Sequence, residues 1–343
     1  MLWSIIFAQC TTTAKKEKLG DSLLIFQDSL QAGELIIRDN VDSFFNVAGK
    51  TDMAIQMKLS RMDISRDSIL TLYRSFLKKD VSNWQPEETE AMHKLLQSAK
   101  EMLDRINPEL FPKEINLIKS KGLAYGNDVY YTRENTIIIP ENIFINWQPE
   151  IQLRILIHEL YHIISRYNTT FRDSTYHTIG FKKTARQVEI PEFLRQKMLT
   201  NPDGIKADYA IELPDAEGMP RWFVPLIVSR YRSYLPGNGS YFDHIKLELF
   251  PVTDNGNEKL TLQTNGEVFS DFTDDVLPAY QHKISSNTGY IIHPDEICAD
   301  HFVMAIWKNE NKKISFLPPA VQSPAGDSII NSFLLVIKSP NIH

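Results

Sequence analysis

Hydrophobic positions between residues 21 and 125 recur with the period of amphipathic helices. In the stretch DSILTLYRSFLKKD, apolar side chains three or four positions apart form one stripe. The stretch QPEETEAMHKLLQSAKEMLDRI begins with Pro86 and acidic residues, as the first turn of a helix does. The two stripes consist of Ile69, Leu72, Tyr73, Phe76 and Leu77, and of Met92, Leu95, Leu96, Ala99 and Leu103. The pattern predicts a helical N-terminal region over 21–125.

After residue 126 the period changes to that of strands. DVYYT and TIIIP predict two strands that form a hairpin around RENT. Pro149 and Glu150 then open a strongly apolar helix that contains IQLRILIHELYHIISRYN. Between about 200 and 290, the turn signals NPDG, LPGNGS, TDNGN and TNGE separate strand-like runs such as HIKLELFPV and EKLTLQT. This segment is expected to be a β-rich insertion.

A second helix is predicted in HPDEICADHFVMAIWKN, beginning at Pro294. Together these elements predict an α+β fold. We expect residues 126–310 to form one domain, with the insertion inside it. Residues 311–343 would be a C-terminal segment that ends in a helix or a strand.

The composition is that of an ordinary globular chain. At 343 residues, with 43% hydrophobic and 23% charged residues, the chain can bury a sizeable core. Its net charge of -6 argues against a nucleic-acid partner, because such proteins usually carry a basic surface. No apolar run reaches the roughly 18 residues that a membrane-spanning helix needs. The oligomeric state stays open.

The first 20 residues are expected to be the tail end of an export signal. A short apolar run ends at the small residue Ala8, and Cys10 could be a lipidated first residue of the mature chain. This predicts an exported protein, in the periplasm, outside the cell or lipid-anchored. The alternative is a cytoplasmic chain with an apolar start, because no basic residue precedes the run. Cys298, in an apolar helical run, is expected to be a buried free thiol.

The apolar helix carries candidate zinc chemistry in HELYH. His158 and His162 are four residues apart, so both rings face the same side of a helix and can bind one ion. Glu159 lies beside the first histidine, where it can take a proton from metal-bound water as a general base. The alternative is a hydrogen-bonded or solvated trio without a metal. The apolar surroundings favour the metal, because burying these side chains without partners costs several kcal/mol.

The third ligand is not near the motif. A metzincin would have Gly at 165 and His at 168, but Ser165 and Asn168 stand there. A glutamate about 19 to 20 residues after the second histidine, as in many gluzincins, is also missing, since those positions are Phe181 and Lys182.

Glu296 is the predicted third ligand, in the second helix. Asp300 follows four residues later and therefore shares its helical face. An aspartate there can accept a hydrogen bond from a liganding histidine and fix its orientation. An HExxH helix followed by a helix with ExxxD resembles the gluzincin metallopeptidases, although the distance between the two segments is unusually long.

This resemblance implies a zincin-like fold, a Zn²⁺ cofactor and a peptide or protein substrate. It also implies that the strand NTIIIP is the edge strand that pairs with an extended substrate. Tyr241, Tyr290 and His293 are the candidate donors for the oxyanion. A non-peptidase zinc hydrolase and an inactive metal-stabilised binding protein are the alternatives. The intact Glu159 favours catalysis, because a structural site needs no base.

Overall fold

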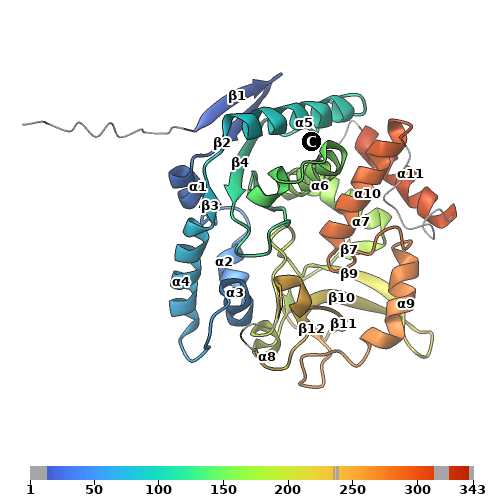
Figure 1. Cartoon of the computed structure of the whole chain (residues 1–343). Coiled ribbons are helices and arrows are strands. Elements are labelled where there is room, and N and C mark those ends of the chain that lie inside the picture. Colours follow the sequence, from blue (N-terminus) through green and yellow to red (C-terminus); the bar gives the residue numbers. More distant parts are fainter. Residues whose placement is uncertain (1–13, 235, 237–238, 313–323, 340–343) are drawn as a thin grey trace, which may run out of the picture.

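The computed structural model describes residues 14–234, 236, 239–312 and 324–339, and within them a mixed α+β architecture (Figure 1). The proposed export signal therefore lies mostly outside the described residues. The α-helices are α1 (Ser29–Leu35), α2 (Phe44–Val47), α3 (Lys50–Met57), α4 (Arg66–Lys79), α5 (Pro86–Asp104), α6 (Pro149–Tyr167), α7 (Thr169–Thr178), α8 (Glu192–Arg195), α9 (Thr273–Lys283), α10 (Pro294–Asn309) and α11 (Pro324–Lys338).

The first sheet has the strand order β1-β2-β4-β6-β5, with β3 paired to β4. β4 runs parallel to β2 and β6 and antiparallel to β3, whereas β5 is antiparallel to β6 and forms an edge of the sheet. The predicted hairpin is thus confirmed. The strands are β1 (Lys15–Leu19), β2 (Ser22–Phe26), β3 (Val81–Ser82), β4 (Glu114–Ser120), β5 (Tyr131–Arg133) and β6 (Thr136–Pro140).

The expectation that NTIIIP is an edge strand is wrong. This segment forms β6, which is paired on one side with β4 and on the other with β5. Its run of isoleucines reflects burial of both faces, because Ile137 and Ile139 contact the core beneath α5 and α6 while Ile138 contacts the opposite core. The edge position belongs to β5.

The N-terminal region is less helical than predicted. It contains the expected helices α4 and α5, but β2 and β4 are central strands of the first sheet. β2 is a short apolar run, and β4 mixes apolar Ile115, Leu117 and Ile118 with buried polar residues. Neither segment shows a strict alternation that would distinguish it from a turn of buried helix.

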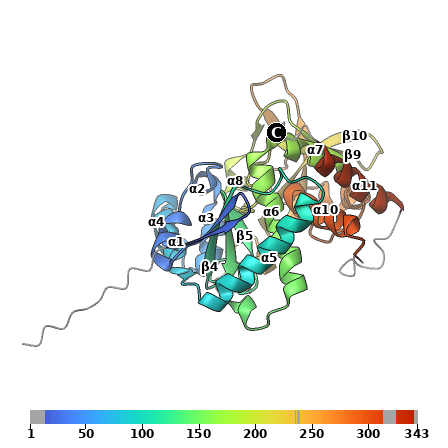
Figure 2. The ribbon, with the colours of Figure 1, turned by 90° about the horizontal axis from the view of Figure 1, so that it is seen from above.

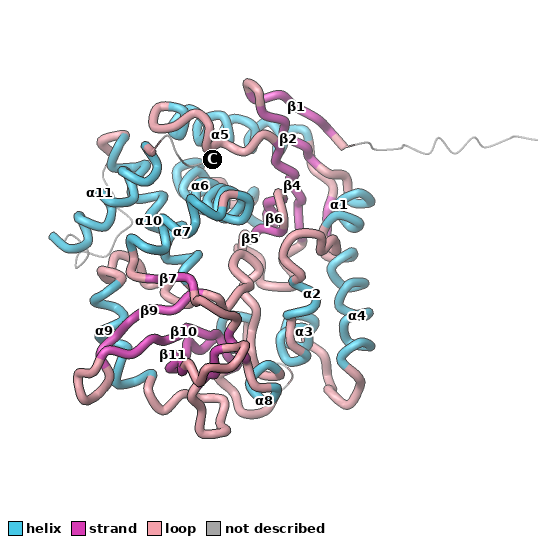
Figure 3. Tube along the Cα trace, turned by 180° about the vertical axis from the view of Figure 1, so that it is seen from behind, coloured by secondary structure: helices cyan, strands magenta, loops and turns pink. Residues whose placement is uncertain are grey.

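The second sheet has the order β7-β9-β10-β11-β12-β8 and lies apart from the first (Figure 3). The strands predicted in HIKLELFPV and EKLTLQT are present as β11 and β12. The members of this sheet are β7 (Phe181–Lys183), β8 (Val188–Glu189), β9 (Tyr209–Pro214), β10 (Pro220–Ser229), β11 (Ile245–Thr253) and β12 (Leu260–Leu262).

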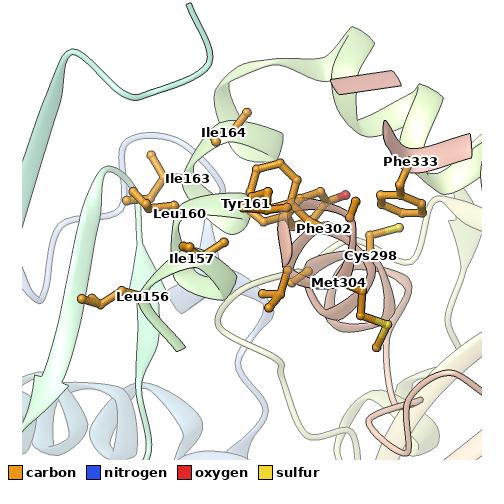
Figure 4. Packing of buried hydrophobic residues seen from close by; sticks show 14 of the residues in the cluster. Leu156, Ile157, Leu160, Tyr161, Ile163, Ile164, Cys298, Phe302, Met304 and Phe333 are labelled. Atoms are coloured by element: carbon orange, nitrogen blue, oxygen red, sulfur yellow. The ribbon is translucent and has the colours of Figure 1, made fainter. Parts of the chain in front are cut away.

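Helix α6 lies between α5 and α10 (Figures 1 and 2). Its apolar side chains, such as Leu156 and Leu160, are buried in the core that also contains Phe302 of α10 and Phe333 of α11 (Figure 4). This packing fixes α6 against α10 along their length, so polar side chains on their facing sides are held at defined distances. Cys298 is a buried free thiol within this core, as predicted. None of the described helices is both long and apolar enough to cross a membrane.

Candidate metal centre

Helix α6 presents the two histidines of the HExxH motif on one face. Pro149 occupies its first turn, and the long apolar stripe holds the helix in the core. The rings of His158 and His162 lie edge to face, with centroids 4.8 Å apart. His162 is fully buried and His158 is nearly so. The spacing of one helical turn therefore brings two imidazoles to one point, as the sequence predicts.

Helix α10 brings Glu296 to the same point. Its Oε2 lies 3.0 Å from His158 Nε2 and 3.6 Å from His162 Nε2. One ligand atom from each of the three residues lies within 4.8 Å of the other two, which is a spacing at which they could share a metal ion. Two nitrogens and one carboxylate oxygen are a donor set that zinc binds in catalytic sites.

Each histidine has a carboxylate on its other ring nitrogen. His158 Nδ1 lies 3.0 Å from Asp300 Oδ1, and His162 Nδ1 lies 3.3 Å from Asp295 Oδ2. A carboxylate at Nδ1 places the proton there and leaves Nε2 free to bind a metal. Both Nε2 atoms are the ones that approach Glu296. The structure thus agrees with the predicted position of Asp300 and adds Asp295, which the sequence analysis missed.

Hydrogen bonds hold these carboxylates in place. Asp295 Oδ1 accepts from Tyr176 at 2.9 Å and from Ser165 at 3.2 Å. Asp300 accepts from the hydroxyl of Thr288. Because these donors come from α6, α7 and the loop before α10, the orientation of both imidazoles is built into the packing of several elements.

Glu296 is oriented by a residue from the loop after α8. The side-chain amide of Asn201 donates a 2.6 Å hydrogen bond to Glu296 Oε1. This bond occupies one carboxylate oxygen and leaves Oε2 facing the histidines. Asn201 belongs to NPDG, which the sequence indicates only as a turn.

A second acidic residue from the same turn approaches the motif. Ligand atoms of Glu159, His162 and Asp203 lie within 4.8 Å of one another. Asp203 is thus near the general base predicted in the sequence, on a part of the chain that gave no functional signal.

Two buried polar atoms of the site indicate whether its residues fit a metal ion. His162 Nε2 and Glu159 Oε2 are buried and have no hydrogen-bond partner among the described residues. Buried polar atoms are nearly always paired with protein, water or an ion. A cation bound by the Nε2 atoms and Glu296, with a water next to Glu159, would satisfy both of these atoms, so the residues present fit a metal.

The pKa values of the two histidines are set by opposing effects. Burial lowers the pKa of His158, but its contacts with Asp300 and Glu296 outweigh burial and raise that pKa to about 10. For His162, burial is likewise outweighed, and the charges of Asp203 and Glu296 raise the pKa well above its ordinary value. The protein thus surrounds these rings with negative charge, and a divalent cation can replace the protons that they would otherwise hold.

The carboxyl groups differ in the direction of their pKa shifts. Burial and the charge of Asp203 raise the pKa of Glu159 to about 8. Burial also opposes ionisation of Glu296, but the neighbouring His162 and His158 hold its pKa well below the usual range. The opposite shifts separate a carboxyl group that can exchange a proton, Glu159, from one that stays ionised and can act as a ligand, Glu296.

The three candidate oxyanion donors lie in different places. Tyr290 stacks beside the His158 ring, with centroids 6.3 Å apart. The Tyr241 hydroxyl donates to the carbonyl of Thr200 at 3.4 Å. His293 caps α10 by accepting from the Asp295 backbone N–H at 3.1 Å. Of the three, Tyr290 is the one with a ring contact to a site histidine.

Comparison of the chain with family models, with curated proteins and with solved structures gives no match.

Proposed function

We propose that the chain is a zinc-dependent metallopeptidase. The observation that carries this proposal is the convergence of His158, His162 and Glu296 on one point, with Glu159 beside them. The order of the segments, an HExxH helix followed by a glutamate helix, supports a zincin-like site of the gluzincin type. The hydrogen-bonded carboxylates behind both imidazoles are typical of catalytic zinc sites.

The chemistry divides between the ion and the side chains. When bound, zinc lowers the pKa of a water molecule toward about 7 and polarises a carbonyl group. Glu159 Oε2 accepts the proton of the attacking water and can pass it to the leaving nitrogen. Burial and the charge of Glu296 hold the pKa of Tyr290 well above 10, so its hydroxyl stays protonated and can donate to the oxyanion.

A hydrolase of small amide substrates is the second candidate. It is favoured by the covering of the edge strand, because the outward N–H of Thr132 in β5 already donates to Asp203 at 2.6 Å. An extended polypeptide cannot pair at that position while this bond is in place. A small substrate would not need the edge strand.

Digestion of a broad peptide library separates the two candidates. The protein is reconstituted with one equivalent of zinc and incubated with the library, with and without a chelator, and the products are identified by mass spectrometry. We expect chelator-sensitive cleavage at internal peptide bonds. Zinc-dependent hydrolysis of short acyl-amides, with no cleavage in the library, would support the second candidate instead.

A further inference from the structure

Residues Thr200–Gly204, which we call the cap segment, cover the metal centre and the edge of the first sheet. The segment follows α8 and precedes β9 in the chain. It contributes Asn201 and Asp203 to the immediate surroundings of Glu296 and His162. Its position raises the question of how a substrate reaches the site.

The cap segment occupies the free edge of β5. Asp203 Oδ1 accepts from both the backbone N–H and the hydroxyl of Thr132, each at 2.6 Å. Since β6 pairs with β5 on the other side, this N–H is a group that an incoming strand would use. The carboxylate therefore takes the place of a backbone carbonyl.

The same carboxylate lies at the open side of the metal centre. Three positions around an ion would be taken by His158, His162 and Glu296. A fourth position on the side of Glu159 would lie close to Asp203, because ligand atoms of Glu159, His162 and Asp203 are within 4.8 Å of one another. Asp203 thus shares with Glu159 the space in which water and substrate would bind.

The cap segment is fastened at both ends. Thr200 N–H donates to Asp52 of α3 at 3.0 Å, and Arg166 of α6 donates to the carbonyls of Pro202 and Asp203 at 3.3 and 3.1 Å. At the other end, a Cβ added to Gly204 would lie 2.3 Å from the His293 ring, which shows how closely the backbone packs there.

Little space remains for a substrate beneath the segment. Three cavities that it helps to line have volumes of about 70, 30 and 20 Å³. These hold a few water molecules at most, since one water needs about 10–15 Å³ by this kind of measure. The side chains of His162 and Glu296 are at most 2% exposed. For a peptide to reach these two side chains, the cap segment would have to move.

We propose that the cap segment is a built-in inhibitory device, in which Asp203 blocks the open position of the metal and the edge of β5 at once. The inference rests on the metal centre of the proposed function. A substrate or activating partner displaces Asp203 from both places, which frees the edge strand and the catalytic position together. The apparent affinity for any external ligand of the metal then equals the affinity of the open state multiplied by the fraction of molecules that are open.

Cobalt-substituted protein tests this directly, because the visible spectrum of Co²⁺ reports on ligands at its open position. Acetohydroxamate is titrated into the parent protein and into Asp203→Asn, which keeps an oxygen to accept from Thr132 but removes the charge. We expect the variant to bind acetohydroxamate at least about tenfold more tightly, because the neutral amide no longer competes for the open position, which is free in about 10% or less of the parent molecules. The matched control is Asp208→Asn, whose carboxylate lies outside the candidate metal groups.

Hydrogen exchange of the parent gives a second readout that does not depend on a variant. Binding of acetohydroxamate to the cobalt protein should speed exchange of the Thr132 amide and of residues 199–207. The proposal would be overturned if the parent, Asp203→Asn and Asp208→Asn bound acetohydroxamate with equal affinity. It would also be overturned if acetohydroxamate left the amide exchange of Thr132 and residues 199–207 unchanged. Loss of cobalt from Asp203→Asn would make Asp203 a permanent ligand and also overturn it. If the parent bound no cobalt, the result would instead contradict the metal centre of the proposed function.

Discussion

His158 Nε2 and Glu296 Oε2 lie 3.0 Å apart although 138 residues separate them in the chain. The contact joins α6 to α10, whose apolar faces pack in one core. The large β-containing segment between these helices leaves and returns, and it supplies Asn201 and Asp203 to the surroundings of the site. A site assembled in this way depends on each of its three donors, which leads to direct predictions.

Replacing Glu296 with Gln should remove most of the bound metal. The variant keeps the volume and the oxygen that accepts from Asn201, but it loses the anionic ligand. Metal content per chain, measured by plasma mass spectrometry, should fall from near one zinc to a small fraction. The control is Glu217→Ala, an exposed residue between β9 and β10. A full complement of zinc in Glu296→Gln would mean that the carboxylate is not a ligand.

Replacing Glu159 with Gln should leave the zinc content unchanged and reduce turnover by at least about 100-fold, the usual contribution of a general base. Glu150→Gln, an exposed change in the first turn of the same helix, is the matched control and should keep full activity. Initial rates are measured on the peptide that the parent cleaves best. Comparable rates for Glu159→Gln and the parent would exclude Glu159 from the reaction.

Asp295→Asn should weaken zinc binding by about 10- to 100-fold, because the residue orients His162 and increases its basicity. Competition with a chelating dye gives the dissociation constant. Asp274→Asn on α9, an exposed acidic position, changes the charge equally and should bind zinc as the parent does. An unchanged constant in Asp295→Asn would show that its contact with His162 is dispensable.

Asp52 should make the fold less stable as the pH rises. Burial raises its pKa from 3.8 to about 6, so the folded chain holds this proton more tightly than the unfolded chain. Titration of Asp52 therefore lowers the free energy of unfolding between pH 4 and 6, by on the order of 1–3 kcal/mol. Above pH 6 this group adds no further pH dependence.

The variant Asp52→Asn lacks this titration. Urea unfolding of parent and variant at a series of pH values should show a difference in stability that changes in favour of the variant from pH 4 to 6 and then stays constant. Comparing the change with pH, rather than the absolute stability, cancels the loss of one acceptor for Thr200 or Gln56. A pH-independent difference would contradict the assignment.

The local parts of the site could be predicted from the sequence because helical periodicity fixes them. His158 and His162 are one turn apart in an apolar helix, and Glu296 and Asp300 are one turn apart in another. Asp295 was missed because it is adjacent to Glu296 and therefore does not share the helical face of Glu296 and Asp300. In the structure the Nδ1 atoms of the two imidazoles contact different carboxylates, Asp300 for His158 and Asp295 for His162.

The non-local parts could not be predicted in this way. Asn201 and Asp203 lie in a turn, and nothing in NPDG indicates that the turn folds over the metal centre. The position of β6 inside the sheet depends on its parallel pairing with β4, a separate strand that precedes the β5–β6 hairpin. Sheet order is set by such long-range pairings and not by the pattern within one strand.

Anomalous diffraction at the zinc edge, from crystals of the protein reconstituted with one equivalent of zinc, tests the central claim most directly. We expect one peak, about 2.0–2.2 Å from His158 Nε2, His162 Nε2 and a Glu296 oxygen. An empty map at this point, or a peak bound by other residues, would contradict the metal centre and the hydrolase proposed from it.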